Sequence, residues 1–288
     1  METIIVSFSD PHCASPMGLL PPGQIQLQTG NFKQNKIQRL TWKMFDKHTA
    51  AIGEMRKDAK LIVVAAGDIT EGTHHDNKQV LSNYATDQQQ IGIAVIDHAL
   101  SNMKFKAGDK LFFLRGTNSH GGENEAAIAR DFGAEAYRKD SGKLDRNGEP
   151  LKDGMYCHPS LRLNVNGVRM WWAHKLASVG KGANRENALR NYIRNLRLDM
   201  YAQNIIPPDY IIGAHFHQRL YVPDAHRDHE TKGFILPPYK AKDDYTMEGF
   251  APFGLGDIGL HWVKVFDDGS SNWGWMSEEI EQIKEIKL

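Results

Sequence analysis

The chain has 288 residues with thirteen histidines, and its 35 lysines and arginines balance 35 aspartates and glutamates. A chain of this length hides about three quarters of its unfolded surface on folding, so its core needs no covalent cross-links. Its two cysteines, Cys13 and Cys157, exclude a disulfide framework and a zinc site made of four cysteines. Zero net charge gives no general attraction to nucleic acid or membranes, so any preference for a polyanion must be local.

Neither a membrane span nor a secretory signal is predicted. The apolar runs are all shorter than the roughly 18 residues that a membrane-spanning helix needs. The first residues lack a basic cluster, and Asp10 interrupts the apolar stretch early, which argues against a secretory signal. Charge is evenly mixed, without repeats or a long linker. We therefore expect a single domain over residues 1–288, soluble and located in the cytoplasm.

Short apolar runs alternate with helical patterns along the first two thirds of the chain. Nearly continuous apolar stretches of strand length, typical of strands covered on both faces, are Thr3–Ser9, Leu61–Ala66, Lys110–Arg115, Val168–Trp172 and Tyr210–Gly213. Apolar residues at helical spacing predict helices over Lys36–Arg56, Thr86–Met103 and Asn187–Gln203. This alternation predicts an α/β fold.

The pattern changes near the C-terminus. Gly233–Tyr239 and Leu260–Phe266 are predicted strands, and Asp267–Ser271 is a turn that leads into a return strand at Trp273–Trp275. A capping signature predicts a helix over Ser277–Lys287. Polar composition predicts exposed loops at Asp140–Asp153 and at Pro223–Lys232, the second of which carries His226 and His229.

Polar residues follow each of the five predicted buried strands. In chain order they are Asp10 and His12, Asp68, Asn118 and His120, His174, and finally His215 and His217. In open α/β sheets ligands gather outside the carboxyl ends of the strands, so these side chains should share one edge. In an extended backbone residues i and i+2 point the same way, which would make Asp10 with His12, and His215 with His217, two pairs.

This set of side chains suits divalent metals that accept imidazole and carboxylate, such as Mn²⁺, Fe²⁺ or Zn²⁺. Taken singly, a Gly-Asp after a strand is usually a turn, and a lone histidine is usually a core residue. The ordered series is what indicates a metal site. Without His120 the set has seven candidate ligands, which are too many for one ion and suit two ions about 3.5–4 Å apart that share a carboxylate. A hydroxide held between them would be a strong nucleophile at neutral pH.

The ordered series resembles the signature of the calcineurin-like metallophosphoesterases. The family's elements D-x-H, GD, a GNH-like motif, H and G-x-H-x-H read here as SDPH, AAGDITEG, RGTNSH, WWAH and GAHFH, between residues 10 and 217. The opening SDPHCASPMGLLPP and the RGTxxH form look most like members found in phage and prophage genomes. In one respect this chain departs from the pattern, because Ser119 separates Asn118 from His120.

The resemblance implies a four-layer α-β-β-α sandwich of two mixed β-sheets and two divalent ions, Mn²⁺ foremost, with Fe, Zn or Ni as alternatives. It implies that the first ion is held by Asp10, His12, Asp68 and His217. Asp68 would bridge to the second ion, which Asn118, His174 and His215 would complete. His120 would lie near the scissile phosphate and stabilise the transition state or protonate the leaving oxygen.

The implied activity is phosphate-ester hydrolysis by a metal-bridging hydroxide. A phosphodiesterase or nuclease that acts on nucleic acid or a nucleotide is the first hypothesis, which would place the protein in the cytoplasm of a bacterial host if it is phage-derived. A phosphomonoesterase for proteins or small molecules is the second. A non-catalytic binding module that retains the fold is the third.

Further residues are candidates for contact with substrate or for support of the metal ligands. Candidate substrate contacts are His74, His75, Arg115, Lys175 and Arg185. Glu71 is a candidate to orient a histidine ligand, and Cys13 is expected to pack in the core. Arg190, Arg194 and Arg197 recur at helical spacing and could track a phosphate backbone, or could equally form the solvated face of a surface helix.

Overall fold

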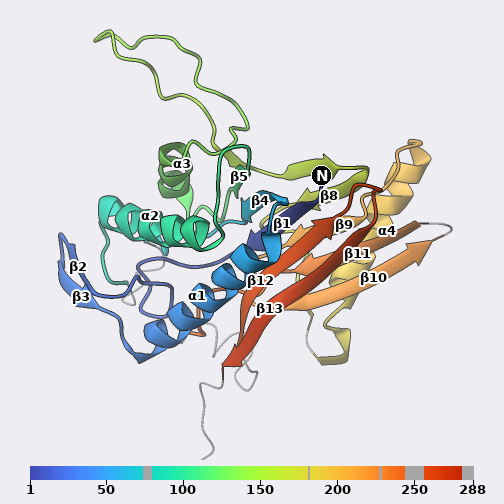
Figure 1. Cartoon of the computed structure of the whole chain (residues 1–288), viewed down its shortest axis with the longest axis horizontal. Helices are drawn as coiled ribbons and strands as arrows, with labels where there is room; N and C mark the ends of the chain where they lie inside the picture. The colour runs from blue at the N-terminus through green and yellow to red at the C-terminus, as the bar shows by residue number, and fades with distance from the viewer. Residues whose placement is uncertain (74–79, 181, 227–228, 244–255, 281–288) are drawn as a thin grey trace, which may run out of the picture.

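The structure is a computed structural model that describes residues 1–73, 80–180, 182–226, 229–243 and 256–280. Two large β-sheets form its centre (Figure 1). The first sheet has the strand order β13 (Ser271–Ile280), β12 (Gly256–Val265), β1 (Thr3–Phe8), β4 (Lys60–Ala65), β5 (Lys110–Leu114) and β6 (Cys157–His158). The second has the order β10 (Leu220–His226), β11 (His229–Ile235), β9 (Tyr210–Gly213), β8 (Val168–Trp172) and β7 (Leu161–Val165).

Both sheets are mixed. In the first sheet β1, β4, β5 and β6 are parallel, while β12 and β13 add an antiparallel hairpin at one side. In the second sheet β8, β9 and β11 are parallel, and the edge strands β7 and β10 are antiparallel to their neighbours. The carboxyl ends of the parallel strands are where the predicted site residues follow.

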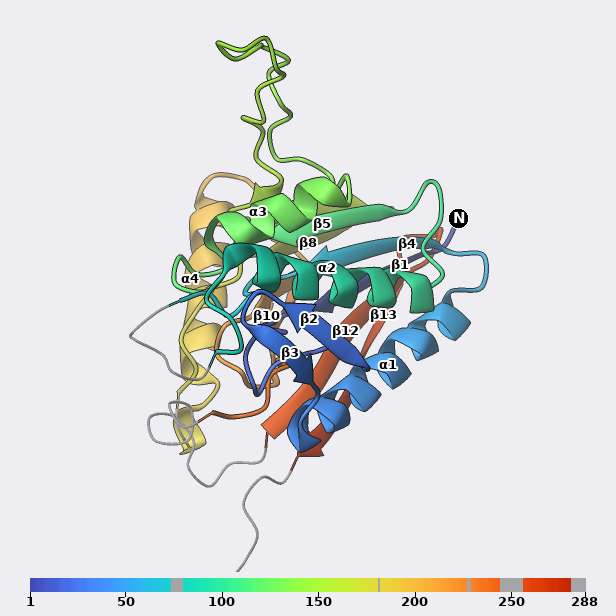
Figure 2. The same cartoon turned by 90° about the vertical axis from the view of Figure 1, so that its left-hand side faces the viewer.

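Helices cover the outer face of each sheet. α1 (Lys36–Arg56), α2 (Ala85–Asn102) and α3 (Gly122–Asp131) lie over the first sheet, in front of it in Figure 2, and α4 (Asn187–Ala202) packs on the second. A short helix at Gly182–Asn184 precedes α4, and the hairpin of β2 (Gln24–Leu27) and β3 (Gly30–Lys33) follows β1.

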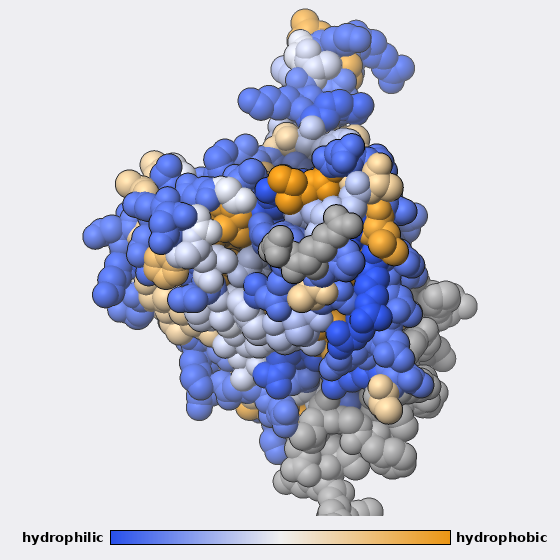
Figure 3. All heavy atoms as spheres, turned by 90° about the vertical axis from the view of Figure 1, so that its right-hand side faces the viewer, coloured by the Kyte–Doolittle hydropathy of each residue, from blue (hydrophilic) through white to orange (hydrophobic). Residues whose placement is uncertain are grey.

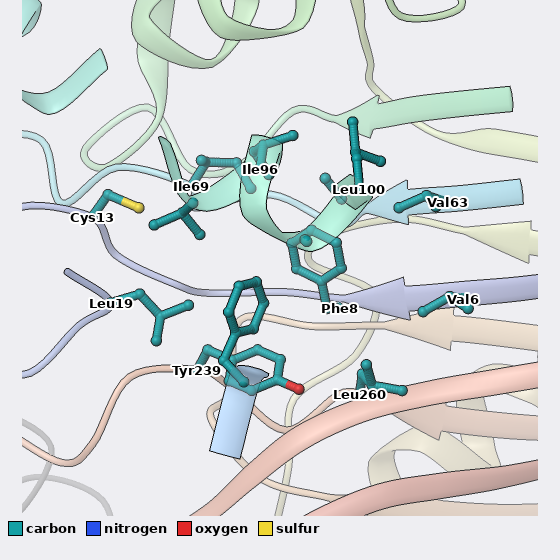
Figure 4. Close-up of a cluster of buried hydrophobic side chains, with 14 of the residues drawn as sticks. Val6, Phe8, Cys13, Leu19, Val63, Ile69, Ile96, Leu100, Tyr239 and Leu260 are labelled. Atoms are coloured by element: carbon teal, nitrogen blue, oxygen red, sulfur yellow. The ribbon is translucent and has the colours of Figure 1, made fainter. Parts of the chain in front are cut away.

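Three hydrophobic cores separate the four layers. β1 shows how one strand serves two of them: Val6 and Phe8 face the helices, whereas Ile5 faces the second sheet, because alternate side chains of a strand point to opposite faces. Figure 4 shows the helix-side core around Phe8. The third core lies between α4 and the second sheet and includes Leu189 and Ile193. The predicted α-β-β-α sandwich is therefore confirmed.

The predicted bounds of α1, β8 and β9 match the structure, and the other predicted buried strands agree within a residue or two. Residues 140–153 form the expected exposed loop, which projects beyond α3 in Figure 1. The prediction missed α3, the β2–β3 hairpin and the short edge strands, whose apolar patterns are weak. Whether residues 1–288 form one domain stays a prediction.

Two C-terminal predictions are wrong. Pro223–Lys232 is not an exposed loop, because its described residues belong to β10 and β11, and its polar Asp224 and Thr231 are buried against α4 and Pro208. The helix predicted from Ser277 does not begin there, because β13 continues to Ile280, which pairs with Gly256 across the hairpin and is buried. The rest of that predicted helix lies outside the described residues.

The arginines of α4 tie this helix to the β10–β11 hairpin. The buried Arg197 donates to the Asp224 carboxylate (2.9 Å) and to the carbonyls of His226 and His229 (3.1 and 3.0 Å). Arg194 donates to the same carboxylate (2.8 Å). Arg190 pairs with Glu186 and the Pro223 carbonyl. The three arginines are thus occupied by contacts within the protein, which argues against the hypothesis that they track a phosphate backbone. They tie α4 to the hairpin, so they are not a purely solvated helix face either.

The outer surface on this side of the molecule is mostly hydrophilic, with small apolar patches (Figure 3). Across the described residues, none of the helices combines the length and the apolar character needed to cross a bilayer.

A buried histidine makes the stability of the fold sensitive to acid. His261 lies between the sheets, fully buried beside the rings of Phe234 and Trp275, and neither of its ring nitrogens has a hydrogen-bond partner. Burial lowers the pKa of His261 to about 3. The folded protein therefore keeps this ring neutral, whereas the unfolded chain takes up a proton below a pKa of about 6.5. Stability is thus lost as the pH falls from about 6.5 toward 3.

We predict that His261→Phe removes part of this acid sensitivity while keeping the aromatic packing. Between pH 7 and pH 5 the wild-type protein should lose about 2 kcal/mol more unfolding free energy than the variant, by linkage for a fully buried group. Urea denaturation of the metal-free proteins at both pH values measures the difference. His226→Phe, at an exposed position, is the control and should behave as the wild type. Equal pH dependence in wild type and His261→Phe would contradict the prediction.

Candidate metal centre

Histidine and aspartate side chains from distant parts of the chain meet beyond the carboxyl ends of the parallel strands. One group is Asp10, His12 and His217, and a second is Asp68, His174 and His215; within each group the candidate ligand atoms lie within 4.8 Å of one another. In Figure 4 the strands that carry Val6 and Val63 point toward the segments of Cys13 and Ile69, which lie just past Asp10 and Asp68. Strand direction thus brings the two groups to one edge, as the sequence predicts.

The first group surrounds the buried carboxylate of Asp10. Its Oδ1 lies 3.3 Å from Nε2 of His217 and 3.7 Å from Nε2 of His12. The two Nε2 atoms are themselves 3.2 Å apart. Nδ1 of His12 donates to Oε2 of Glu71 (2.8 Å), so Nε2 is the nitrogen that faces the Asp10 carboxylate.

The second group surrounds Asp68. Its Oδ2 lies 3.0 Å from Nε2 of His174 and 3.9 Å from Nδ1 of His215. Nδ1 of His174 donates to the carbonyl of Ala66 (2.7 Å), which again leaves Nε2 to face the carboxylate. The groups adjoin, because the backbone N–H of His215 donates to Oδ2 of Asp10 (3.3 Å).

Charge is concentrated here without water to screen it. Burial alone would raise the pKa of Asp10 and of Asp68, but the surrounding histidines lower both pKa values well below the usual range, so both carboxylates are ionised. For His12 and His174, burial favours the neutral ring, but the neighbouring carboxylates outweigh it and raise their pKa values to about 9 and about 10. The carboxylates therefore favour cationic partners, and in the absence of metal those partners are the protonated rings of His12 and His174.

The donor set fits a divalent cation. Oδ1 of Asp10 and Nε2 of His174 are buried and have no hydrogen-bond partner, although buried polar atoms are normally satisfied. Imidazole nitrogens and carboxylate oxygens are the donors that Mn²⁺, Fe²⁺ and Zn²⁺ accept. A cation between these atoms would satisfy both orphaned groups.

The backbone at these positions is in an uncommon conformation. Five of the predicted ligands have left-handed φ values: Asp10 (52°), His12 (43°), Asp68 (51°), His215 (74°) and His217 (51°). Such values are uncommon for residues other than glycine, and strained conformations of this kind gather at functional sites. They also show that the reason given for the pairs was wrong. Asp10 and His12 do meet, but through left-handed turns rather than as positions i and i+2 of an extended strand, whereas His215 and His217 belong to different ligand groups.

Buried side chains hold the turns in place. Glu71, which accepts from His12, also pairs with the buried Lys240 (3.1 Å), so its predicted contact with a histidine is confirmed. Glu125 of α3 accepts from the backbone N–H groups of Ile69 and Gly116 (both 2.8 Å) and so clamps the loops after β4 and β5 together. Cys13 packs in the helix-side core as expected, and burial raises the pKa of its thiol.

The loop after β5 brings Thr117 and His120 to the centre. The backbone N–H and the hydroxyl of Thr117 donate to Oδ1 of Asp68 (2.7 and 3.0 Å). Asn118 is exposed, and its Oδ1 accepts from Arg115 (2.9 Å). His120 lies with its ring centroid 4.6 Å from that of His12, and its Nδ1 donates to the carbonyl of Glu71 (2.7 Å). Sequence reasoning missed Thr117, although its place directly after Gly116 is where the GNH motif has its asparagine.

The candidate substrate contacts have mixed positions. His74 and His75 lie outside the described residues. Lys175 is exposed directly after His174, and Arg115 is exposed beside Asn118. Arg185 is half-buried and donates to the carbonyl of Arg219 (2.9 Å). Substrate contact by these five residues stays a prediction.

We predict that Glu71→Gln weakens metal binding. The amide cannot replace the charge that orients His12 and pairs with Lys240, and loss of such a support typically costs 10- to 100-fold in metal affinity, as an order of magnitude. Calorimetric titration with Mn²⁺ measures the change. Glu149→Gln in the exposed loop is the matched control and should bind as the wild type. Unchanged affinity in Glu71→Gln would show that the contact does not support the site.

No protein-family model and no curated protein matches the sequence. Among solved structures, Vps29 from Chaetomium thermophilum aligns over 96% of this chain and 95% of its own, with 10% identity and a TM-score of 0.37. The Thermus thermophilus sulfate thiohydrolase SoxB aligns over 96% of this chain but 56% of its own, with 14% identity and a TM-score of 0.40. A Thermotoga maritima protein aligns over 95% and 98%, with 11% identity and a TM-score of 0.34.

Likenesses this distant support no conclusion about activity. The chain itself combines two mixed sheets between helices with an ordered aspartate and histidine series at the strand ends. Closeness to phage and prophage members stays a prediction. The two mixed sheets between helices, and the order of the aspartate and histidine residues, agree with what the sequence resemblance to calcineurin-like metallophosphoesterases implies.

Proposed function

We propose that this protein is a phosphoesterase that depends on two divalent cations. The observation that carries the proposal is the pair of adjoining ligand groups around the ionised Asp10 and Asp68, in which buried donor atoms lack partners. Asp10, His12, Asp68 and His217 would hold the first cation. Asp68, His174 and His215 would hold the second; Asn118, which the resemblance adds to this cation, is exposed and accepts from Arg115 instead. Mn²⁺ is the first candidate, and Fe, Zn and Ni are alternatives.

The bound cations would supply a water of lowered pKa as nucleophile and would neutralise phosphate oxygens. The residues of the chain do the rest. Glu71 and the Ala66 carbonyl fix the tautomers of His12 and His174, so that Nε2 of each ring faces a carboxylate. The clamp formed by Glu125 keeps the loop of Asp68 against the loop of His120.

We assign His120 a place beside the scissile phosphate. Its ring orientation is held by the hydrogen bond from Nδ1 to the Glu71 carbonyl (2.7 Å). Burial and the nearby His12 lower the pKa of His120 to about 4, so the ring is neutral at neutral pH before substrate binds. An anionic phosphate favours the protonated ring, which would then stabilise the transition state or protonate the leaving oxygen.

A phosphodiester is the substrate class that we propose, in a nucleic acid or a nucleotide. A monoester dianion needs more positive charge around it than a diester monoanion does. Among the described residues, Lys240 contacts Glu71, the side chain that orients His12 (3.1 Å), and it also pairs with Asp243 (2.8 Å). The charge of this lysine is thus already balanced inside the protein, which favours the diester.

We also propose a reducing, cytoplasmic location. Both cysteines, Cys13 and Cys157, are buried free thiols, which persist in reducing compartments.

We predict metal-dependent hydrolysis with a preference for diesters. Exhaustive chelation should abolish turnover, and Mn²⁺ should restore it, because the proposed nucleophile is a water activated by the bound cations. Bis-p-nitrophenyl phosphate should be cleaved with a higher kcat/KM than p-nitrophenyl phosphate. Preference for the monoester would overturn the diester assignment alone, whereas full activity after chelation would overturn the proposed function. Two bound Mn²⁺ without hydrolysis of either ester would point to a binding module.

We predict that His120→Asn lowers kcat without loss of metal. A positioned acid–base group contributes about 10²- to 10⁴-fold, so kcat should fall by a factor in that range. Elemental analysis should still find the wild-type metal content, because neither proposed cation is assigned to the third group of possible ligands, which His120 forms with His12 and Glu71. Wild-type turnover in this variant would remove His120 from the mechanism.

A further inference from the structure

The Asp68 carboxylate is held differently at its two oxygens. Oδ1 accepts two hydrogen bonds from Thr117, one from the backbone N–H (2.7 Å) and one from the hydroxyl (3.0 Å). Oδ2 faces His174 and His215, at 3.0 and 3.9 Å. The Thr117 hydroxyl also lies 3.3 Å from Oδ2, so Thr117 holds the whole carboxylate, most closely at Oδ1, with Oδ2 toward the second ligand group.

The Thr117 hydroxyl is itself oriented. Oγ of Ser119 donates to Oγ1 of Thr117 (3.2 Å), so the hydroxyl can accept from Ser119 while it donates to Asp68. Ser119 is the residue by which this chain departs from the GNH pattern. The structure thus gives the extra residue a contact that supports the bridging carboxylate.

The backbone of the loop after β5 lies close against the Asp68 carboxylate. A Cβ atom on Gly116 would lie 2.3 Å from Oδ1 of Asp68, so the loop after β5 approaches the carboxylate as closely as glycine allows. Glu125 holds the loops after β4 and β5 together by accepting hydrogen bonds from the backbone N–H groups of Ile69 and Gly116. Thr117 is therefore pressed against Asp68 by a rigid arrangement.

Asn118, in contrast, turns its side chain elsewhere. The residue is exposed, and its Oδ1 accepts from Nη2 of Arg115 (2.9 Å). The family pattern assigns an asparagine to the second cation, but in this chain the neighbouring threonine makes the contact with the shared carboxylate.

We infer that Thr117, rather than Asn118, is the residue of the β5 loop on which binding of the second cation depends. It acts as a positioning residue, since its hydrogen bonds hold Asp68 with Oδ2 toward His174 and His215, the side chains that would complete the second cation site. This inference rests on the proposed metal centre and adds to it a role that the family pattern places on another residue.

The test compares Mn²⁺ binding by Thr117→Val, Thr117→Ser and Asn118→Ala with the wild type. Valine keeps the shape and the backbone N–H of Thr117 but removes the hydroxyl. It should weaken the second Mn²⁺ by about 10- to 100-fold, the usual effect of losing a partner of a metal ligand. At a fixed, limiting Mn²⁺ concentration the electron paramagnetic resonance signal should change from that of an exchange-coupled pair to that of single ions. Serine should restore the coupled signal, and Asn118→Ala should keep it.

Thermal melting of the metal-free variants separates a local role from a loss of fold. If Thr117→Val binds two Mn²⁺ as tightly as the wild type, the inference is overturned, whatever its melting temperature. Loss of the second Mn²⁺ in Asn118→Ala overturns it too, because the asparagine would then be needed. A wild-type protein that binds no pair of Mn²⁺ ions would overturn the proposed metal centre itself, an outcome distinct from the other two.

Discussion

Two buried, ionised carboxylates at the ends of neighbouring strands are the constraint around which this structure is arranged. Asp10 and Asp68 are fully buried, and burial opposes their charge. A charge in such a place must be compensated by partners at close range, because water cannot solvate it. Histidines from β1, β8 and β9 and donors from the β5 loop supply part of this compensation. Oδ1 of Asp10 still makes no hydrogen bond. A bound cation would complete the compensation of its charge.

The fold keeps this arrangement rigid from several directions. The parallel strands of both sheets end at the same side of the molecule. The hydrophobic cores on the two faces of the first sheet hold its strands in position. The left-handed turns that carry the ligands are costly, and buried groups such as Glu125 and the Glu71–Lys240 pair hold them. A centre built in this way is preorganised, so little free energy is spent on rearranging ligands when a cation binds.

The contacts of the α4 arginines show that a strong basic signal in the sequence can serve structure rather than chemistry. The arginines of α4 are the strongest local basic signal in the sequence, yet Arg197 is buried under Asp224 and the hairpin carbonyls. Their spacing is the same for a phosphate-binding row and for a set of ion pairs within the protein, of which the Arg197 pair is buried. Which of the two it is depends on the charge of the opposite surface, here Asp224 of β10, and that surface comes from another part of the chain.

Much of this protein was readable from local pattern alone. The buried strands, the long helices and the ordered polar residues after each strand all follow from hydrophobic periodicity and residue chemistry, which depend on near neighbours. Tertiary structure decided the rest. It turned Pro223–His226, His229–Lys232 and Ser277–Ile280 into paired strands, because pairing partners satisfy backbone groups whatever the local composition. It also placed Thr117 on Asp68 and turned Asn118 toward Arg115. Such contacts depend on the path of two loops that meet only in the folded chain, and no local pattern encodes that path.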